Sequence, residues 1–599
     1  MSWASGARYQ RVQTNDWSEE EEEKKKEEKV TIYLHSASAR SLLSRQKRET
    51  CLRITASMVL LCVGLYFGFH VLRYDSLEAP EKGNGAKGGK AHHGPEEGHH
   101  RHDDDEGDGH HHPGNKVVPA HRHEHGVYHH AAVITDSEIC SSFAKEILSE
   151  GGTAVDAGVV AMLCLGVVHP HSTGIGGVIS AVFHNKTSGT TKALNALPTE
   201  SLNMSWGVPS TLQGLRLMHR EYGSLSWTEL FQRPAKLARE GFPIDHALAK
   251  AMRDTEGLGA HLCPLLCHRG RPLKEGMGMN ATNERLANVL EEVSAEMEGA
   301  SFPESLAWQL ARDMPMPDKL AFVEALKRQR AALIEPLVTE LDRFFLYVPP
   351  SPAAGAVTTE IVERAGQLGL SLASVSGAAN ASDTYRHVLN AAEQIYKSYP
   401  GFLGLRPGGH QERREGKPSL KTAQTGSHVT VIDASGNVLA MVGSLNSTFG
   451  AKFLSPSTGI FFSDFTWSVD SAVLYWTCPA VLTAMAGDRL VAVASAGGAS
   501  APFSVAQVVL NKVYFERSAR EAVAGPRFYL SVGEGGVLHK RVSGLRRESE
   551  VFTLLSREEP ELEVVNGTAS GVTVTVVESH LGHTSAFGQP RTCAYVDGY

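Results

Sequence analysis

Hydrophobic residues run without a charged side chain from Ile54 to Leu72, a stretch of 19 residues. A helix needs about 20 such residues to cross a bilayer. Five Arg or Lys residues lie between positions 40 and 53, whereas only Arg73 follows the stretch directly. Basic residues favour the cytoplasmic side, so the pattern predicts a single-pass type II signal anchor with an extracellular or lumenal ectodomain. A cleaved signal peptide is the alternative, but it would begin near residue 1.

The segments on either side of this stretch are polar. Residues 1–53 contain a run of Glu followed by Lys, which is typical of a solvated tail. Residues 73–126 are rich in Gly, His and Asp and have few large apolar side chains, so they cannot bury enough surface to offset their chain entropy. We therefore expect a cytoplasmic tail (1–53), an anchor (54–72), a stalk (73–126) and a folded ectodomain (127–599).

Helical periodicity opens the ectodomain. Thr135 and Glu138 have the spacing of a capping box, apolar residues then repeat at helical spacing, and Gly151-Gly152 ends the pattern. The next segment, Ala154 to Val168, is apolar on all sides except at Asp156, which predicts a buried helix.

Strand patterns gather in the C-terminal third. His428–Asp433 and Val438–Val442 flank Ala-Ser-Gly-Asn and predict a hairpin, while 490–494 and 572–577 are further β-rich runs. Residues 502–515 predict a helix after a Gly-Gly turn. Helical patterns dominate the first part of the ectodomain, and strand patterns mixed with helical ones dominate the last part. This order indicates an α+β fold or a layered α/β/α sandwich.

Composition narrows the class of protein. The chain is 42% hydrophobic and 21% charged, as globular proteins are, and its net charge of −8 argues against a nucleic-acid-binding protein. Thirteen of its 28 histidines lie between positions 92 and 130, mostly in the predicted stalk. They do not have the ligand spacing of a closed zinc site, so we predict a solvated spacer, no dedicated metal site and no cofactor.

Cysteines and glycosylation sequons fit a secretory-pathway protein. Six cysteines follow the anchor, where the compartment is oxidising and disulfides form. Six Asn-X-Ser/Thr sequons lie there too, and we expect glycans on most of them. The expected glycosylation sites are Asn185, Asn203, Asn280, Asn380 and Asn566, and the sixth sequon is at Asn446.

Three short motifs can carry chemistry: the turn His171–Gly177, the sequence Thr425–His428 at a strand start, and Ser495–Gly498 between a strand and a helix. Together with other ordered matches over most of 127–599, they resemble the gamma-glutamyltransferase (glutathione hydrolase) family. The matching segments are Gly151–Ala157, His171–Gly177, Val208–Gly214, Leu237–Pro243, Pro349–Gly355, Ser444–Gly450, Leu454–Gly459 and Ala496–Gly498.

The resemblance implies an N-terminal-nucleophile hydrolase fold, a four-layer αββα sandwich, in a precursor (zymogen) that cleaves itself before a threonine. The freed threonine hydroxyl would attack a gamma-glutamyl amide with its own amine as base, and the glutamyl group would pass to water or to an acceptor amino acid or peptide. Thr425 carries over as the nucleophile, Ser444 as its supporting hydroxyl, and Gly497 and Gly498 as the oxyanion hole. Self-cleavage would leave a large part, 1–424, and a small part, 425–599, as a heterodimer.

The resemblance also implies two disulfides, Cys140–Cys164 and Cys263–Cys267. The nucleophile of the family lies two residues before a His, but here that position is Gly426, with Thr425 before it and Ser427 after it. A one-residue bulge would restore Thr425. Ser427 is the alternative, and without cleavage Thr425 would be a plain turn residue.

The implied donor pocket departs from the family pattern. Asn446 and Asp464 carry over as substrate contacts, but hydrophobic residues replace the expected cation and hydroxyls. Leu197 stands where the family has an Arg for the α-carboxylate, Tyr475 and Trp476 where it has two Ser, and Ser463 near a missing Glu. A glycan on Asn446 would also fill the pocket.

Two functions follow from these observations. The first is a membrane-anchored gamma-glutamyltransferase that acts on glutathione and related gamma-glutamyl compounds. The second is a catalytically weak or inactive ectodomain on the same scaffold that serves as a binding protein.

Overall fold

The computed structural model describes most of the predicted ectodomain. The described residues are 126–198, 206–255, 262–277, 280–297, 302, 304–316, 318–399, 424–465, 475–532, 538–565, 572–590 and 592–599. The predicted tail, anchor and nearly all of the predicted stalk lie outside these residues, as do Asn203 and Asn566. Within the described residues, no helix is long and apolar enough to cross a membrane.

Two helices begin the folded part, as the periodicity predicts. Helix α3 spans Glu138–Ser149 and α4 spans Ala154–Val168. Thr153 and Asp156 form a reciprocal capping box at the start of α4, which is buried almost throughout. The predicted capping box of Thr135 and Glu138 is wrong. Thr135 is the last residue of a strand and its hydroxyl bonds to Ser137, which takes the N-cap position of α3 without a side-chain capping bond.

Two seven-stranded sheets form the centre of the fold. In order across the first sheet, the strands are β1 (Val127–Tyr128), β20 (His583–Gly588), β19 (Thr573–His580), β15 (Arg489–Ala496), β14 (Ala480–Ala484), β11 (Phe344–Val348) and β10 (Leu337–Leu341). In the second, they are β21 (Tyr595–Gly598), β2 (Ala132–Thr135), β12 (Gln424–Ile432), β13 (Val438–Ser447), β3 (Val178–Asn185), β4 (Thr190–Ala196) and β9 (Ala332–Ile334). The predicted hairpin is β12–β13, and the predicted runs at 490 and 572 are β15 and β19.

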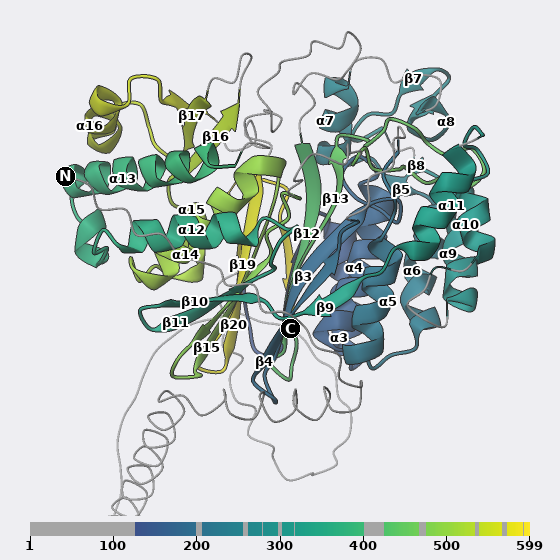
Figure 1. Ribbon diagram of the computed structural model, residues 1–599, viewed down its shortest axis with the longest axis horizontal. Helices are drawn as coiled ribbons and strands as arrows, with labels where there is room; N and C mark the ends of the chain where they lie inside the picture. Colours follow the sequence, from purple (N-terminus) through teal and green to yellow (C-terminus); the bar gives the residue numbers. More distant parts are fainter. Residues whose placement is uncertain are drawn as a thin grey trace, which may run out of the picture. The chain divides into compact units, whose positions relative to one another are not determined.

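Helices cover the outer face of each sheet, so the fold has four layers, αββα (Figure 1). The helices associated with the second sheet are α3, α4, α5 (Thr211–Tyr222), α6 (Trp227–Glu240), α7 (His246–Asp254), α8 (Cys263–Leu266), α9 (Glu284–Glu296), α10 (Glu304–Leu310) and α11 (Asp318–Arg328). Those associated with the first sheet are α12 (Gly355–Gly366), α13 (Ala378–Lys397), α14 (Ala501–Val513), α15 (Ala519–Ala524) and α16 (Glu550–Glu558). A short 3-10 helix, η2 (Gly498–Ser500), precedes α14.

Smaller sheets lie at the periphery. They are β16 (Arg527–Val532) with β17 (Leu538–Ser543) and β18 (Glu563–Val564), β5 (Phe242–Pro243) with β8 (Asn280–Ala281), and β6 (Cys267–His268) with β7 (Arg271–Pro272). A 3-10 turn, η1 (Leu372–Val375), precedes α13.

The hydrophobic core has three layers that match this architecture. A small cluster between the two sheets includes Ile134, Ile432, Ala440 and Ala492. Larger clusters fill the spaces between each sheet and its helices. Along β12, Val429 and Val431 face the helical layer, whereas Ile432 faces the other sheet. The alternation of period two continues before them, since Thr430 and His428 contact Thr575 and Thr573 of the other sheet and Ser427 contacts Ser172.

Candidate active site

A small cavity lies where the starts of β12 and η2 meet. Its volume is about 20 Å³, which is room for about one water molecule and far below the roughly 300–1,000 Å³ of typical small-molecule pockets. The residues that line it are Thr425, Gly426, Val442, Ser444, Asn446, Phe465, Trp476, Thr477, Ala496, Gly497 and Gly498. The tertiary structure thus brings together all four predicted catalytic residues and Asn446. None of the described lining residues carries a charge.

A β-bulge interrupts the hairpin at the predicted nucleophile. Thr425 pairs with Asn446, but Ser427 pairs with Gly443, so Gly426 alone lies opposite Ser444 and Leu445. The extra residue of this bulge belongs to β13 and not to β12, so it does not take up the extra residue between Thr425 and His428, as the bulge expected from the sequence would.

The two candidate nucleophiles, Thr425 and Ser427, lie in different surroundings on either side of the bulge. Gly426 faces the other sheet, since a Cβ on it would lie 3.5 Å from the Cβ of Ala496. Thr425, one residue earlier, borders the cavity and is half-buried. Ser427 is only 1% exposed and its hydroxyl lies 2.6 Å from that of Ser172, away from the cavity lining. The geometry favours Thr425 over Ser427 as the nucleophile.

Ser444 joins the two strands across the bulge. Its hydroxyl donates to the backbone carbonyl of Thr425 at 2.7 Å and accepts the backbone N–H of Asn446 at 2.8 Å. Asn446 has a φ of 75°, a left-handed conformation that Asn tolerates better than most residues. The predicted supporting hydroxyl therefore contacts the predicted nucleophile directly.

Gly497 and Gly498 form a tight turn on the opposite side of the cavity. Both have positive φ, 125° and 69°, which a side chain would disfavour. Successive N–H groups in such turns form concave sites for anions. The turn is thus suited to stabilise the negative oxygen of a tetrahedral intermediate.

An apolar cluster occupies the side of the site where the family resemblance places the donor carboxylate. Leu197 is 4% exposed and packs with Val178, Ala353, Phe465 and Tyr475. The hydroxyl of Tyr475 donates to the carbonyl of Pro198 at 2.7 Å, which keeps the ring inside the cluster. Phe465 of this cluster borders the cavity, and no member of the cluster offers a charged partner to a carboxylate.

The other predicted donor contact, Asp464, does not line the cavity. Asp464 accepts the backbone N–H of Ser447 at 3.1 Å, and its own N–H donates to the carbonyl of Leu445 at 3.2 Å. Asp464 therefore supports β13 at the bulge and does not line the cavity. Ser463 is fully buried, and its hydroxyl has no hydrogen-bond partner.

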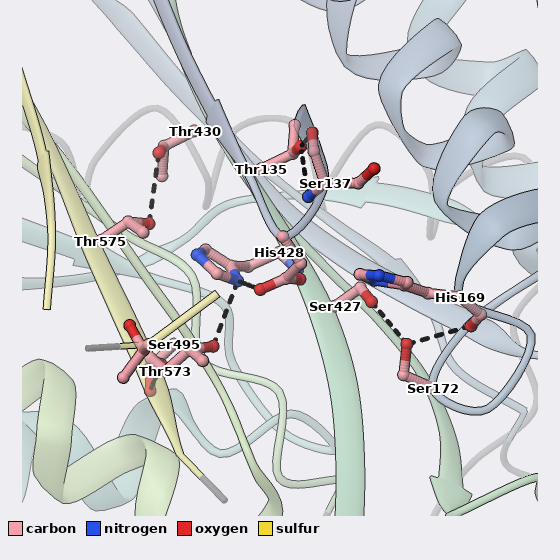
Figure 2. A network of polar contacts seen from close by, with 12 residues as sticks. Thr135, Ser137, His169, Ser172, Ser427, His428, Thr430, Ser495, Thr573 and Thr575 are labelled. Carbon is pink, nitrogen blue, oxygen red and sulfur yellow. Dashed lines mark hydrogen bonds and ion pairs between the residues drawn. The ribbon is translucent and has the colours of Figure 1, made fainter. Parts of the chain in front are cut away.

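Sequence analysis missed a polar network beneath the start of β12 (Figure 2). Asp136 accepts the backbone N–H of His428 at 2.8 Å, and its other oxygen lies 2.8 Å from the Nδ1 of the same residue. His428 is fully buried, and its Nε2 has no hydrogen-bond partner among the described residues. The only local signal was the position of Asp136 directly after a strand, and this does not identify its partner.

A second His–Asp pair joins the buried His169 to the half-buried Asp245. His169 Nε2 and Asp245 Oδ2 are 2.5 Å apart. Burial alone would lower the pKa of His169, but the Asp245 carboxylate outweighs it and raises that pKa. Burial would likewise raise the pKa of Asp245, yet His169 holds it at about 2. For the neighbouring His171, burial and the charge of His169 lower the pKa to about 3.

Both predicted disulfides, Cys140–Cys164 and Cys263–Cys267, are present. The first joins α3 to α4. Within the described ranges, no group of three or more His, Cys, Asp or Glu side chains could hold a metal ion. Asn185 is half-buried and Asn380 is exposed, and the glycosylation of each sequon stays a prediction.

Comparison with known proteins identifies relatives that match this architecture. A model of the gamma-glutamyltranspeptidase family matches residues 140–404 and 406–593. Glutathione hydrolase 6 of mouse is 35% identical over 377 residues, which cover 62% of this chain and 65% of the mouse protein. The bovine protein of that name is 33% identical, with 63% and 67% covered. This chain thus spans slightly less than two thirds of the mouse relative's length.

A solved structure agrees on the fold. Cephalosporin acylase from Bacillus halodurans superposes with a TM-score of 0.65 at 19% identity, covering 81% of this chain and 99% of the acylase. Such low identity supports the fold alone, a layered architecture of mixed α and β structure. Because the family model covers most of the chain, the chain belongs to the gamma-glutamyltranspeptidase family.

Proposed function

We propose that this chain is a self-processing gamma-glutamyl hydrolase and transferase, of the kind that cleaves glutathione, with Thr425 as nucleophile. The observation that carries the proposal is that Thr425 and the Gly497-Gly498 turn border one cavity, with the Ser444 hydroxyl bonded to the Thr425 carbonyl. Asn446 borders the same cavity and is the proposed donor contact. No cofactor is part of the proposed reaction.

The proposed reaction forms and breaks one bond at a time. The Thr425 hydroxyl adds to the carbonyl carbon of the gamma-glutamyl amide, and its proton passes to the free α-amine of the same residue. The N–H groups of Gly497 and Gly498 stabilise the resulting oxyanion. The C–N bond then breaks, the amine product takes the proton, and water or an acceptor amine releases the glutamyl group from Thr425.

Self-cleavage before Thr425 would leave two pieces that stay together. The small part would contribute β12 and β13 to the second sheet, where they pair with β2 and β3 of the large part. A cut at residue 425 would also free the side chain of Thr425 to rotate toward the Gly497 turn, since its peptide bond to residue 424 would be gone.

The test is the fate of the full chain after expression in a secretory host. We expect a denaturing gel to show two pieces, and N-terminal sequencing of the smaller to begin at Thr425. Thr425→Ala should stay a single chain, whereas Thr430→Ala, on the same strand and bonded to Thr575, should still cleave. An intact wild-type chain would contradict the proposal, because an internal threonine has no free amine.

A second candidate function is a catalytically silent binding scaffold. The apolar cluster that includes Leu197, Phe465 and Tyr475 and the small volume of the cavity favour it. Losing one charged contact to the donor carboxylate costs about 1.5–3 kcal/mol, or roughly ten- to a hundredfold in affinity. A cleaved protein that releases no glutamate from glutathione at millimolar concentration would support this second function.

For location, the proposal is a type II membrane protein with residues 54–72 as its anchor. The uncharged stretch and the basic residues before it support this orientation. The two disulfides fit an oxidising compartment. In microsomes, added protease should shorten the chain by its N-terminal tail only. Protection of the whole chain, or loss of the ectodomain, would contradict this topology.

A further inference from the structure

The start of β12 extends past its neighbouring strand. On one side β12 pairs with β13 along most of its length, but on the other it pairs with β2 only from Val429 to Ile432. Residues 424–428 therefore have no strand partner on the β2 side. Pairing with β13 on one side and side-chain contacts on the other therefore hold them in position.

Asp136 provides a hydrogen-bond partner for β12 just beyond the end of β2. It follows Thr135, the last residue of β2, and its carboxylate accepts the backbone N–H of His428, the residue before the last β2 pair. This bond substitutes for the missing strand partner of His428. The hydrogen bond holds the backbone of His428. Residues 425–427 do not take part in it and need other contacts on this side of β12.

Ser172 contacts both strands at the bulge. Its hydroxyl lies 2.6 Å from the hydroxyl of Ser427 on β12, as Figure 2 shows. Its backbone carbonyl accepts the N–H of Leu445 on β13 at 2.9 Å. Leu445 is one of the two residues opposite Gly426, so Ser172 is bonded to each strand at the place where the register shifts.

Ser172 is itself firmly held. Its N–H and hydroxyl both donate to the backbone carbonyl of His169, at 3.0 and 3.1 Å. The ring of His169 is paired with Asp245, the N-cap residue of α7. Ser172 is only 2% exposed. Because its hydroxyl donates to His169, the Ser427 hydroxyl is the donor between the two serines.

We infer that Ser172 is a positioning residue that fixes the register shift of the β12–β13 hairpin and thereby places Thr425 beside the Gly497-Gly498 turn. Only the effect of Ser172 on self-cleavage and catalysis by Thr425 rests on the proposed function. The hydrogen bonds of Ser172 to Ser427 and Leu445 exist in the uncleaved chain and can be tested there.

The first test measures self-cleavage of the full chain by pulse–chase. Ser172→Ala should slow the cut by about two- to tenfold, the effect of one net hydrogen bond. Ser180→Ala is the matched control, because Ser180 is also buried in the second sheet and donates to the carbonyl of Leu194 at 3.1 Å. Ser427→Ala removes the same hydrogen bond from β12 and replaces Ser172→Ala if that variant does not fold.

The double variant shows whether Ser172 acts through Ser427. We expect Ser172→Ala with Ser427→Ala to cleave as slowly as either single variant, since both remove one shared hydrogen bond. Independent effects that multiply, or equal slowing by Ser180→Ala, would overturn the inference and leave a general loss of stability as the cause.

Hydrogen exchange of the uncleaved Thr425→Ala chain separates the two proposals. Adding Ser172→Ala should speed exchange in peptides covering residues 424–430 by about two- to tenfold, and adding Ser180→Ala should not. Unchanged exchange there overturns the positioning role whether or not the wild type cleaves. Failure of the wild type to cleave, with faster exchange, overturns the proposed function alone.

Discussion

The hydroxyl of Ser444 donates a 2.7 Å hydrogen bond to the backbone carbonyl of Thr425 across the bulge. The same oxygen accepts the backbone N–H of Asn446. One side chain thus ties the predicted nucleophile to the predicted substrate contact, although 19 residues separate Ser444 from Thr425.

Replacing Ser444 should impair self-cleavage more than folding. Ser444→Ala removes the bond to Thr425 and leaves the N–H of Asn446 without its partner, which together cost about 1–3 kcal/mol. We expect cleavage slowed by about tenfold or more in a time course on denaturing gels. Ser444→Thr keeps the hydroxyl and should cleave near the wild-type rate. Equal slowing by both variants would show that the hydroxyl is not what matters.

Glycan occupancy should differ among the sequons. Asn446 borders a cavity of about 20 Å³, in which a sugar does not fit. Asn185 is the last residue of β3 and is half-buried, and Asn380 is exposed near the start of α13, so both can carry glycans. Glycosidase release in heavy-oxygen water with peptide mass spectrometry should label Asn185 and Asn380 and leave Asn446 unlabelled. A labelled Asn446 would mean that the described cavity cannot form in that molecule.

The two disulfides should contribute unequally to stability. Cys140 and Cys164 are 24 residues apart in sequence, whereas Cys263 and Cys267 are 4 apart. Loop-closure entropy then assigns about 3 kcal/mol to the first and about 2 kcal/mol to the second. Cys140→Ala with Cys164→Ala should lower the melting temperature more than Cys263→Ala with Cys267→Ala. The reverse order in thermal unfolding would indicate that strain, and not chain entropy, dominates.

His171 should make the fold sensitive to acid. Its pKa is about 3 in the folded state and about 6.5 in the unfolded chain, so the unfolded state binds more protons between these values. Stability is therefore lost as the pH falls from 6.5 toward 3, by about 2 kcal/mol at pH 5 for this group. The pair of His169 and Asp245 does not offset the loss, because both stay charged between pH 3.8 and 6.5.

The variant His171→Leu isolates this effect. Thermal unfolding at pH 7 and pH 5 should show a smaller loss of stability on acidification in the variant than in the wild type, by about 2 kcal/mol. The substitution also changes the packing against Phe449 and with it the free energy of unfolding at pH 7. The test therefore compares the change in stability between the two pH values and not the stability at pH 7. An unchanged difference between the two pH values would show that His171 is not the group that titrates.

Local patterns in the sequence determined most of the secondary structure. Ala154–Val168 is apolar on nearly all sides, which only a helix buried on all sides can satisfy, and it forms α4. The hairpin around Ala-Ser-Gly-Asn follows from turn chemistry and alternation of adjacent residues. The motifs also predicted Thr425, Ser444, Gly497 and Gly498 as site residues through the family resemblance, and these four border one cavity. The start of α3 was misjudged, because the pairing of β2 with β12 takes Thr135 into a strand.

Only the tertiary structure decided which candidate nucleophile borders the site. The register shift at Gly426 places Thr425 at the cavity and leaves Ser427 bonded to Ser172. A bulge exists only once two strands are paired. Here Ser444 and Leu445 of β13 create it opposite Gly426. For the same reason Asp136 and Ser172 gave no sign of their roles, because a hydrogen bond between residues about 250 or more apart is a property of the folded sheet.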